Sequence, residues 1–379
     1  MKTVGIICEY NPFHLGHLRQ INLIRDTFGE DTAIVCVMSG NYVQRGEPAM
    51  WDKFTRASAA VACGVDLVLE LPITKVLQSA EGFARGGVEL LSKLGIVDIL
   101  CFGAESGDVN NLMDIARKLD SGKDIFQDAL SRGLSYAAAR QLAAEDKDNL
   151  LSKPNNILAV EYCRALQYFN SSITPMVVQR NGNYHDQTPD SREPSATSIR
   201  ACFPDRNWHQ FVPQAARQHL SDASWYMLSA GERAILARLR ALSDKEWESC
   251  AHGSEGLWSK AMKMSRTENS LTSIIDSVKS KRYPRTRIQR LLLCAYLGIS
   301  STVLSSPLSY ARILAASEAG RTLIRAAKKA SVIPLVNPGE EPRDTTYYRL
   351  EVQASDLFTL FCVPDPPHCK MEQNARLHI

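Results

Sequence analysis

The chain has 379 residues, of which 45% are hydrophobic and 22% are charged, and its formal net charge at pH 7 is +3. This composition is ordinary for a soluble globular protein of two or three domains, and the small charge permits a polyanionic partner without requiring one. No apolar run approaches the roughly 18 residues that a membrane-spanning helix needs, and no signal peptide is visible, so we expect a cytoplasmic protein with no membrane partner.

Strand-like and helix-like patterns alternate through the first hundred residues. Apolar runs rich in β-branched residues predict strands, and apolar residues at helical spacing predict the helices between them. Gly64 and Gly95 are placed to end two of these helices. Such alternation is typical of an α/β fold with a Rossmann-like, doubly wound parallel sheet. The predicted strands cover 3–8, 32–38, 65–72 and 97–105, and the predicted helices cover 18–27, 51–64 and 80–95.

The pattern changes beyond this alternation. A polar helical stretch is followed by an amphipathic helix, a strand and the start of another helix, which cover 106–151, 153–169, 173–180 and 195–200. Further on we expect helices with short loops and no strand before 331–336. We therefore predict two domains, 1–205 with the sheet and 206–379 mainly α-helical. The residues after Ser355 carry no pattern that we can interpret, which leaves open whether they are ordered.

The ten cysteines are scattered along the chain and include no CxxC pair. This distribution favours free thiols in a reducing compartment over a disulfide framework. It also lacks the paired ligands of a structural zinc site. We therefore expect no metal held by the protein itself.

The stretch CEYNPFHLGH, residues 8–17, lies where the first strand gives way to a helix. His14 and His17 are three residues apart, so both rings can approach one ligand from the same side. A helix start also offers unpaired N–H groups to an anion, Gly16 leaves the backbone open, and Pro12 restricts the turn. Two imidazole donors here would hold phosphate oxygens. The alternative is a surface pair of histidines that caps the helix.

This stretch resembles a known signature. HLGH fits the HxGH motif of the nucleotidyltransferase superfamily, and SATSIR (195–200) resembles the superfamily's second motif. The resemblance implies that the hydroxyls of Ser195 and Thr197, together with Arg200, face a nucleotide triphosphate from the side opposite the histidines. The alternative for Arg200 is an ordinary surface position on a helix.

A longer series of motifs narrows the resemblance. EYNPFHLGH, SGNYVQRGEPA, GVDLVLELP, FGAES, KPNNILAVEY, SATSIR and KRYPRTRIQRLLL occur in this order. Together they resemble the bacterial tRNA(Met) cytidine acetate ligase family. That resemblance implies a ligase that joins ATP and acetate into acetyladenylate, with loss of pyrophosphate. It then acetylates the exocyclic N4 amine of the wobble cytidine in elongator tRNA(Met), giving N4-acetylcytidine, without acetyl-CoA.

The resemblance also implies roles for particular residues. His14 and His17 are the expected catalytic residues, 1–205 is the expected ATP-binding catalytic domain, and 206–379 is the expected tRNA-binding domain. Mg²⁺ is expected bound with ATP. Asn155 is favoured over Asn156 as an ATP contact, and its alternative is a helix N-cap. The expected ATP-binding residues are Ile7, Cys8, Glu9, Tyr10, Asn11, Pro12, Phe13, His14, Leu15, Gly16, His17, Leu18, Arg19, Gln20, Gly103, Asn155, Arg180, Ser195, Thr197 and Arg200.

Several other polar residues are weaker candidates. Glutamates near strand ends could line the site, or they could only bind loop N–H groups. Gln44 and Arg45 could contact substrate or tRNA, and the alternative is a solvated turn. Lys53 and Arg56 could reach phosphates, and the alternative is a solvated helix face. No residue can be named as the base that deprotonates the cytidine amine. The glutamates are Glu9, Glu70 and Glu105.

The segment KSKRYPRTRIQR (279–290) is the richest basic cluster, and Tyr283 within it could stack on a base. A second stripe of cations follows at helical spacing. The alternative for either is a solvated face. The expected tRNA-binding residues are Lys279, Lys281, Arg282, Arg285, Arg287 and Arg290, and the second stripe is Arg321, Arg325, Lys328 and Lys329.

Two other functions fit parts of the sequence. An adenylyltransferase that joins AMP to a small phosphorylated metabolite would also use HLGH and SATSIR, but it would not need the basic helical region. A non-catalytic tRNA-binding protein on the same scaffold would not need both histidines, Gly16 and the Ser/Thr/Arg turn.

Overall fold

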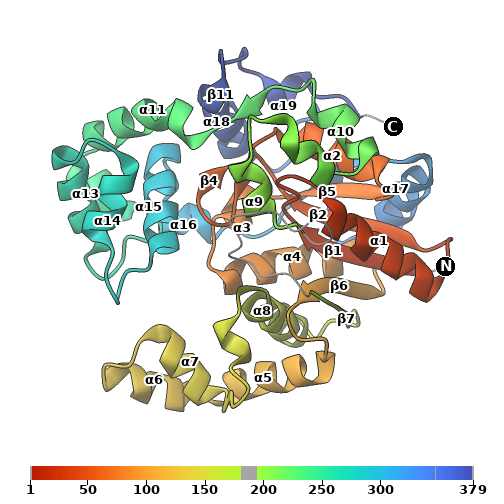
Figure 1. Cartoon of the computed structure of the whole chain (residues 1–379), viewed down its shortest axis with the longest axis horizontal. Helices are drawn as coiled ribbons and strands as arrows, with labels where there is room; N and C mark the ends of the chain where they lie inside the picture. The colour runs from red at the N-terminus through yellow and green to blue at the C-terminus, as the bar shows by residue number, and fades with distance from the viewer. Residues whose placement is uncertain (1, 181–193, 346, 378–379) are drawn as a thin grey trace.

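A seven-stranded sheet in the order β10-β9-β5-β2-β1-β6-β7 lies at the centre of the computed structural model, which describes residues 2–180, 194–345 and 347–377 (Figure 1). Two pairs of short strands, β3–β4 and β8–β11, lie outside it. The strands are β1 (Thr3–Cys8), β2 (Ala33–Ser39), β3 (Tyr42–Val43), β4 (Glu47–Pro48), β5 (Leu67–Leu71), β6 (Ile99–Ala104), β7 (Thr174–Gln179), β8 (Trp225–Tyr226), β9 (Ala311–Ala316), β10 (Leu335–Val336) and β11 (Cys362–Val363).

The five strands from β5 to β7 in this order are parallel, as the alternation of patterns predicts. β1 pairs with β2 on one side and with β6 on the other. Successive strands are therefore added on one side of β1 up to β5 and on its other side from β6, so the strand order reverses between β1 and β6. Loops at the carboxyl ends of two such strands diverge and leave a crevice between them. The α/β fold class and the doubly wound arrangement are confirmed.

The other edge of the sheet comes from the C-terminal half of the chain. β9 pairs antiparallel with β5, and β10 continues parallel to β9. The expectation of no strand before 331–336 is therefore wrong, because the fully buried run ARILAA joins the sheet at 311–316. The division into 1–205 and 206–379 stays a prediction, but the sheet is not confined to the first part.

Helices cover both faces of the sheet and bury two apolar cores. α1, α2 and α10 pack on one face, and α4 and α8 pack on the other. Local sequence sets several boundaries: Ser79 caps α4, Gly95 ends it in the left-handed region at φ +68°, and Pro154 opens α8. The helices of this half are α1 (Leu15–Phe28), α2 (Lys53–Ala62), α3 (Ile73–Val76), α4 (Ala80–Leu94), α5 (Val109–Ser121), α6 (Lys123–Ser131), α7 (Tyr136–Ala143), η1 (Leu150–Ser152), α8 (Pro154–Tyr168), α9 (Ala196–Ala201), η2 (Arg206–Phe211) and α10 (Gln214–Leu220).

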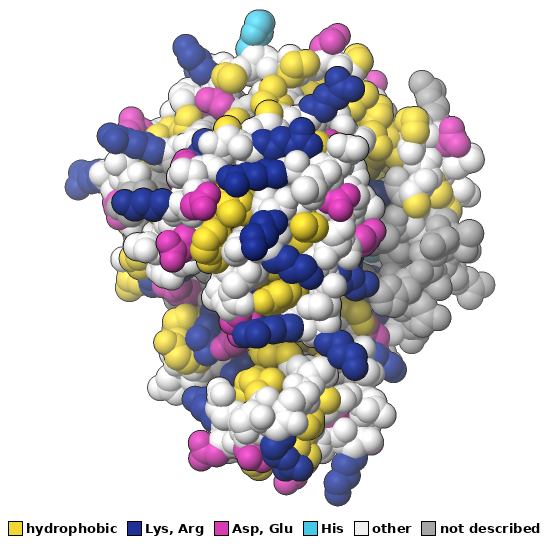
Figure 2. Space-filling view, turned by 90° about the vertical axis from the view of Figure 1, so that its left-hand side faces the viewer, with side chains coloured by type: hydrophobic (Ala, Val, Ile, Leu, Met, Phe, Trp, Pro, Cys, Tyr) yellow, Lys and Arg dark blue, Asp and Glu magenta, His cyan; other side chains and the backbone are white. Residues whose placement is uncertain are grey.

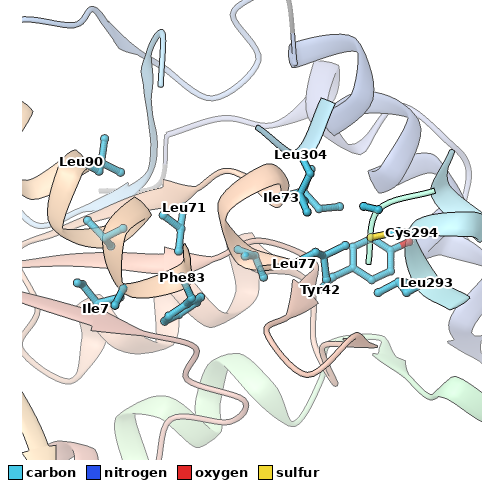
Figure 3. Packing of buried hydrophobic residues seen from close by; sticks show 14 of the residues in the cluster. Ile7, Tyr42, Leu71, Ile73, Leu77, Phe83, Leu90, Leu293, Cys294 and Leu304 are labelled. Atoms are coloured by element: carbon cyan, nitrogen blue, oxygen red, sulfur yellow. The ribbon is translucent and has the colours of Figure 1, made fainter. Parts of the chain in front are cut away.

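Helices α11 to α16, within residues 228–304, form a lobe beside the sheet, at the left of Figure 1. The lobe shares one apolar core with the sheet, and Figure 3 shows Tyr42 of β3 reaching from Leu77 to Leu293 and Cys294. The remaining helices are α11 (Leu228–Ala241), α12 (Asp244–Ser249), α13 (Leu257–Thr267), α14 (Leu271–Val278), α15 (Arg285–Leu297), α16 (Ser301–Leu304), α17 (Glu318–Ala330), α18 (Tyr348–Phe358), η3 (Thr359–Phe361) and α19 (Met371–Asn374).

The residues after Ser355 are ordered as far as 377, with η3, β11 and α19 packed on the rest of the protein. All ten cysteines are free thiols, as their spacing predicts. Among the described residues, no helix is long and apolar enough to cross a bilayer.

Candidate active site

The turn between β1 and α1 places two histidines at the start of a helix. His14 is the N-cap residue, and its Nδ1 accepts a hydrogen bond from the Gly16 N–H at 3.1 Å. The His14 N–H donates to Nδ1 of His17 at 3.2 Å, which completes a capping box. The two rings are stacked with centroids 3.7 Å apart. The histidines therefore cap the helix, as the alternative states, but they are not a surface pair because His14 is buried. Capping occupies only the Nδ1 atoms.

These contacts settle which ring nitrogens carry protons. Because both Nδ1 atoms accept, each neutral ring holds its proton on Nε2, which leaves two N–H donors. Burial, with added repulsion from Arg180 and Arg200, lowers the pKa of His14 to about 3. Burial, His14 and Arg180 hold the pKa of His17 well below its ordinary value. Near neutral pH the pair consists of uncharged hydrogen-bond donors.

Both histidines line a cavity of about 310 Å³ at the carboxyl end of the sheet. Most of the expected ATP-binding residues also line it, whereas Pro12, Phe13, Leu15, Leu18 and Arg19 do not. Phe13 and Leu18 instead pack into the core beneath the turn. The expected residues that line the cavity are Ile7, Cys8, Glu9, Tyr10, Asn11, His14, Gly16, His17, Gln20, Gly103, Asn155, Arg180, Ser195, Thr197 and Arg200.

The helix α9 brings the SATSIR motif against the histidine turn. Ser195 caps α9 by accepting from the Ser198 N–H. Arg200 donates from Nη1 to the Asn11 carbonyl at 2.7 Å and from Nη2 to the Thr197 hydroxyl at 3.3 Å. Arg200 is therefore not an ordinary surface residue: it links the two motifs and sets a positive charge at the cavity.

The two asparagines in the first turn of α8 lie in different surroundings. Asn155 lines the cavity and donates from Nδ2 to Glu105 at 2.8 Å. Asn156 is fully buried, does not line the cavity, and accepts from the Ser106 N–H. The N-cap of α8 is Lys153, so the N-cap alternative for Asn155 is wrong. The preference for Asn155 agrees with this placement.

Gly103 lies at the end of β6, beside Arg180. A Cβ at this position would lie 2.9 Å from Cδ of Arg180, so the missing side chain makes room for the arginine to cross the strand end. In the structure Arg180 fills this room and extends over the cavity that both residues line.

Comparison with known proteins agrees with this geometry. A model of the HIGH Nucleotidyl Transferase family matches residues 1–374. A tRNA(Met) cytidine acetate ligase of Acetivibrio thermocellus is 35% identical over 100% of this chain and 99% of that protein, and one of Clostridium novyi is 34% identical over 95% of each. This chain belongs to the tRNA(Met) cytidine acetate ligase family.

Solved structures of Thermotoga maritima TmcAL extend the comparison. The apo form superposes with a TM-score of 0.90 at 29% identity, covering 100% of this chain and 99% of that one. The form bound with alpha-thio ATP superposes with a TM-score of 0.86 at 29% identity, covering 99% and 97%. The described fold is thus shared across the full length of this family member.

Two cations on α2 of this family member are not phosphate ligands, contrary to one interpretation of the sequence. Lys53 and Arg56 are fully buried, so they do not form a solvated face either. Arg56 donates to the carbonyl oxygens of Trp51, Glu9, Ser39 and Gly40, which fixes the strand ends beneath the cavity.

Lys53 lies in a buried ionic cluster outside the cavity. Its Nζ is 2.7 Å from Glu70 and 2.5 Å from Glu372 of α19. Although burial alone would lower the pKa of Lys53, Glu372 and Glu70 hold it above its ordinary value. Burial and Glu70 raise the pKa of Glu351, which adjoins the cluster, to about 8. Glu70 is therefore a structural residue in this family member.

Part of the cavity wall opposite α8 is formed by residues that the sequence did not predict. Val43 and Glu47 of the β3–β4 hairpin line it together with Gln44 and Arg45. Glu9 receives the Gln44 N–H at 2.7 Å. Nothing in the local pattern marks Val43 or Glu47, because their position depends on how the hairpin packs.

The basic segment 279–290 divides into exposed and buried residues. Arg290 is buried, and burial lowers its pKa to about 10, so the expected tRNA contact at Arg290 is wrong. Arg287 binds Glu255 at 2.8 Å and the His252 and Ser254 carbonyls, which holds the loop before α13. The residues of the segment that remain exposed are Lys279, Lys281, Arg282 and Arg285.

Proposed function

We propose that the protein activates acetate with ATP as acetyladenylate, releases pyrophosphate, and transfers the acetyl group to the N4 amine of the wobble cytidine in elongator tRNA(Met). The stacked His14–His17 pair carries this proposal, because it presents two uncharged N–H donors to a cavity of nucleotide size. Its relatives carry the name of this activity.

The first step needs alignment of phosphates more than a protein nucleophile. Acetate oxygen attacks the α-phosphorus of ATP, and pyrophosphate leaves. The Nε2–H donors of His14 and His17 would bind phosphate oxygens as negative charge builds on them. Arg200 and the hydroxyls at the start of α9 would bind the departing pyrophosphate from the other motif. ATP is proposed to arrive as its Mg²⁺ complex, and acetyl-CoA has no part in the reaction.

The lobe beside the sheet is proposed to bind the tRNA. Figure 2, which views the molecule from the left of Figure 1, shows Lys and Arg side chains spread over this face with Asp and Glu among them. Lys279 and Lys281 are exposed and make no ion pair within the described part of the chain. Such cations neutralise phosphates regardless of sequence, so they would position the tRNA rather than select it.

The test combines both half-reactions in one preparation. Purified protein is given ATP, Mg²⁺, radiolabelled acetate and unmodified tRNA, and pyrophosphate–ATP exchange is followed in parallel. We expect acetate-dependent exchange and label in elongator tRNA(Met). Folded protein that binds ATP but shows neither result would contradict the proposal and point to a small adenylyl acceptor. The free cysteines also fit the proposed cytoplasmic location.

A further inference from the structure

The cavity has two sides, and three of the expected nucleotide contacts lie together on one of them. Gly103, Asn155 and Arg180 lie on β6, α8 and the end of β7, all on one side of β1. The other side is formed by the β3–β4 hairpin. With ATP on the first side, the hairpin side remains for the group that accepts the acetyl.

The hairpin is also the structural link to the basic lobe. Gln289 of α15 donates from Nε2 to Glu47 at 2.7 Å. Gly46, at φ +85°, lies so close to α15 that a Cβ would be 2.7 Å from the Arg290 nitrogen. Tyr42 packs against the same helix in Figure 3. A polynucleotide held at the start of α15 would therefore reach the cavity across this hairpin.

Glu9 lies where these two sides meet, directly after β1. Its Oε1 accepts from the Gln44 N–H at 2.7 Å and from the Ser39 hydroxyl at 3.3 Å. These bonds fix the carboxylate against the hairpin and leave its second oxygen for the cavity that Glu9 lines. Among the described residues that line the hairpin side, the other carboxylate, Glu47, already binds Gln289.

We propose that Glu9 is the catalytic base of the transfer step, accepting the proton of the cytidine N4 amine. This inference rests on the proposed function and supplies the residue that sequence motifs alone did not identify. The N4 nitrogen attacks the acetyl carbonyl carbon, the C–N bond forms, and the bond from that carbon to the phosphate oxygen breaks. AMP leaves with the electron pair, and the N4 proton passes to Oε2 of Glu9 and then to solvent.

The chemistry of the acceptor requires such a group. The exocyclic amine of cytosine donates its lone pair to the ring and is a weak nucleophile, so removal of its proton during attack accelerates the step. A base contributes about 10²- to 10⁴-fold in reactions of this kind. The formation of acetyladenylate, in contrast, moves no proton from a neutral nucleophile, since acetate attacks as an anion.

The experiment compares Glu9→Gln with the unaltered protein in three assays. The glutamine keeps a side-chain oxygen for the Gln44 N–H and Ser39 but cannot take a proton. The assays are acetate-dependent pyrophosphate exchange, acetohydroxamate formation with added hydroxylamine, and label transfer to tRNA. Hydroxylamine attacks acetyladenylate without help from a base. We expect the ratio of tRNA transfer to hydroxamate formation to fall by about 100-fold or more.

The outcomes separate this inference from the proposed function. An unchanged ratio in Glu9→Gln would overturn the role of Glu9 while leaving the ligase proposal intact. Equal loss in all three assays would also overturn it, because Glu9 would then serve adenylation or structure. Absence of acetate-dependent exchange in the unaltered protein would instead refute the proposed function. Ser39→Ala, which removes one bond to Glu9 Oε1, is expected to lower the same ratio by a smaller factor.

Discussion

His14 uses its two nitrogens for different purposes: Nδ1 caps α1, and Nε2 carries the proton offered to the cavity. These purposes can be separated by substitution. Asparagine is a good N-cap residue but has no equivalent of Nε2. We expect His14→Asn to unfold at the temperature of the unaltered protein and to lose pyrophosphate exchange by about 10²- to 10³-fold.

His14→Ala is the matched comparison for that prediction. It removes the cap as well, so we expect its folding free energy to be lower than that of His14→Asn by a further ~1 kcal/mol. Its loss of pyrophosphate exchange should be similar to that of His14→Asn. Thermal unfolding and exchange assays on both variants check this. Full exchange activity in His14→Asn would show that Nε2 is not needed.

The low pKa of His14 makes stability depend on pH. In the unfolded chain the pKa of His14 lies near its ordinary value of 6.5, whereas burial lowers this pKa to about 3 in the folded protein. Between these values the unfolded state binds more protons, so stability is full above pH 6.5 and falls as the pH falls. At pH 5 the loss from His14 is about 2 kcal/mol.

Other groups titrate in the same range, so a difference between proteins is needed to isolate His14. Denaturant unfolding at pH 7.5 and pH 5 should show a drop about 2 kcal/mol larger for the unaltered protein than for His14→Asn. Equal drops in both proteins would mean that His14 is protonated when folded.

At the scale of elements, the short helix α19 is held by one buried carboxylate. Glu372 lies 2.5 Å from Lys53 and accepts the Ser355 hydroxyl at 2.5 Å. Glu372→Ala would leave a buried ammonium short of a partner, so we expect a loss of about 3–5 kcal/mol in unfolding free energy. Asp365→Ala, at an exposed position, should change it by less than about 0.5 kcal/mol.

The contact between the β3–β4 hairpin and α15 gives a second prediction at this scale. In Gly46→Ala, a Cβ would approach the Arg290 nitrogen to 2.7 Å and push the hairpin from the helix. We expect tRNA transfer to fall more than pyrophosphate exchange. Gly29→Ala is the control, because Gly29 has a similar φ of +98° but nothing within 4 Å of its added Cβ. Equal effects of both substitutions would mean that only backbone strain matters.

For the whole molecule, the exposed cations of 279–290 should govern how salt affects tRNA binding. If Lys281 and Arg282 each bind one phosphate, replacing either by Ala should reduce the slope of log affinity against log salt by about 1. Arg117→Ala on α5, away from this segment in Figure 1, should leave the slope unchanged. Arg290→Ala should instead destabilise the fold, since its side chain is buried. An unaltered slope in both lobe variants would place the tRNA elsewhere.

Much of the parallel sheet and the main site motifs could be predicted, because both depend on local patterns. The strand-to-helix turn at His14 and the capped start at Ser195 are encoded within a few residues. β9 escaped prediction because its pairing with β5 is antiparallel and joins distant parts of the chain. Lys53 was misinterpreted for the same reason: its carboxylate partner Glu372 lies near the other end of the sequence.

The placement of β9 has a consequence for the order in which the protein can fold during synthesis. During synthesis, β5 leaves the ribosome long before β9 has been made. The edge of β5 that pairs with β9 therefore stays unpaired until the whole helical lobe has been synthesised. An open edge of apolar strand is a template for unwanted pairing. A nascent chain that stalls after residue 205 would therefore carry both nucleotide motifs and still be prone to aggregate.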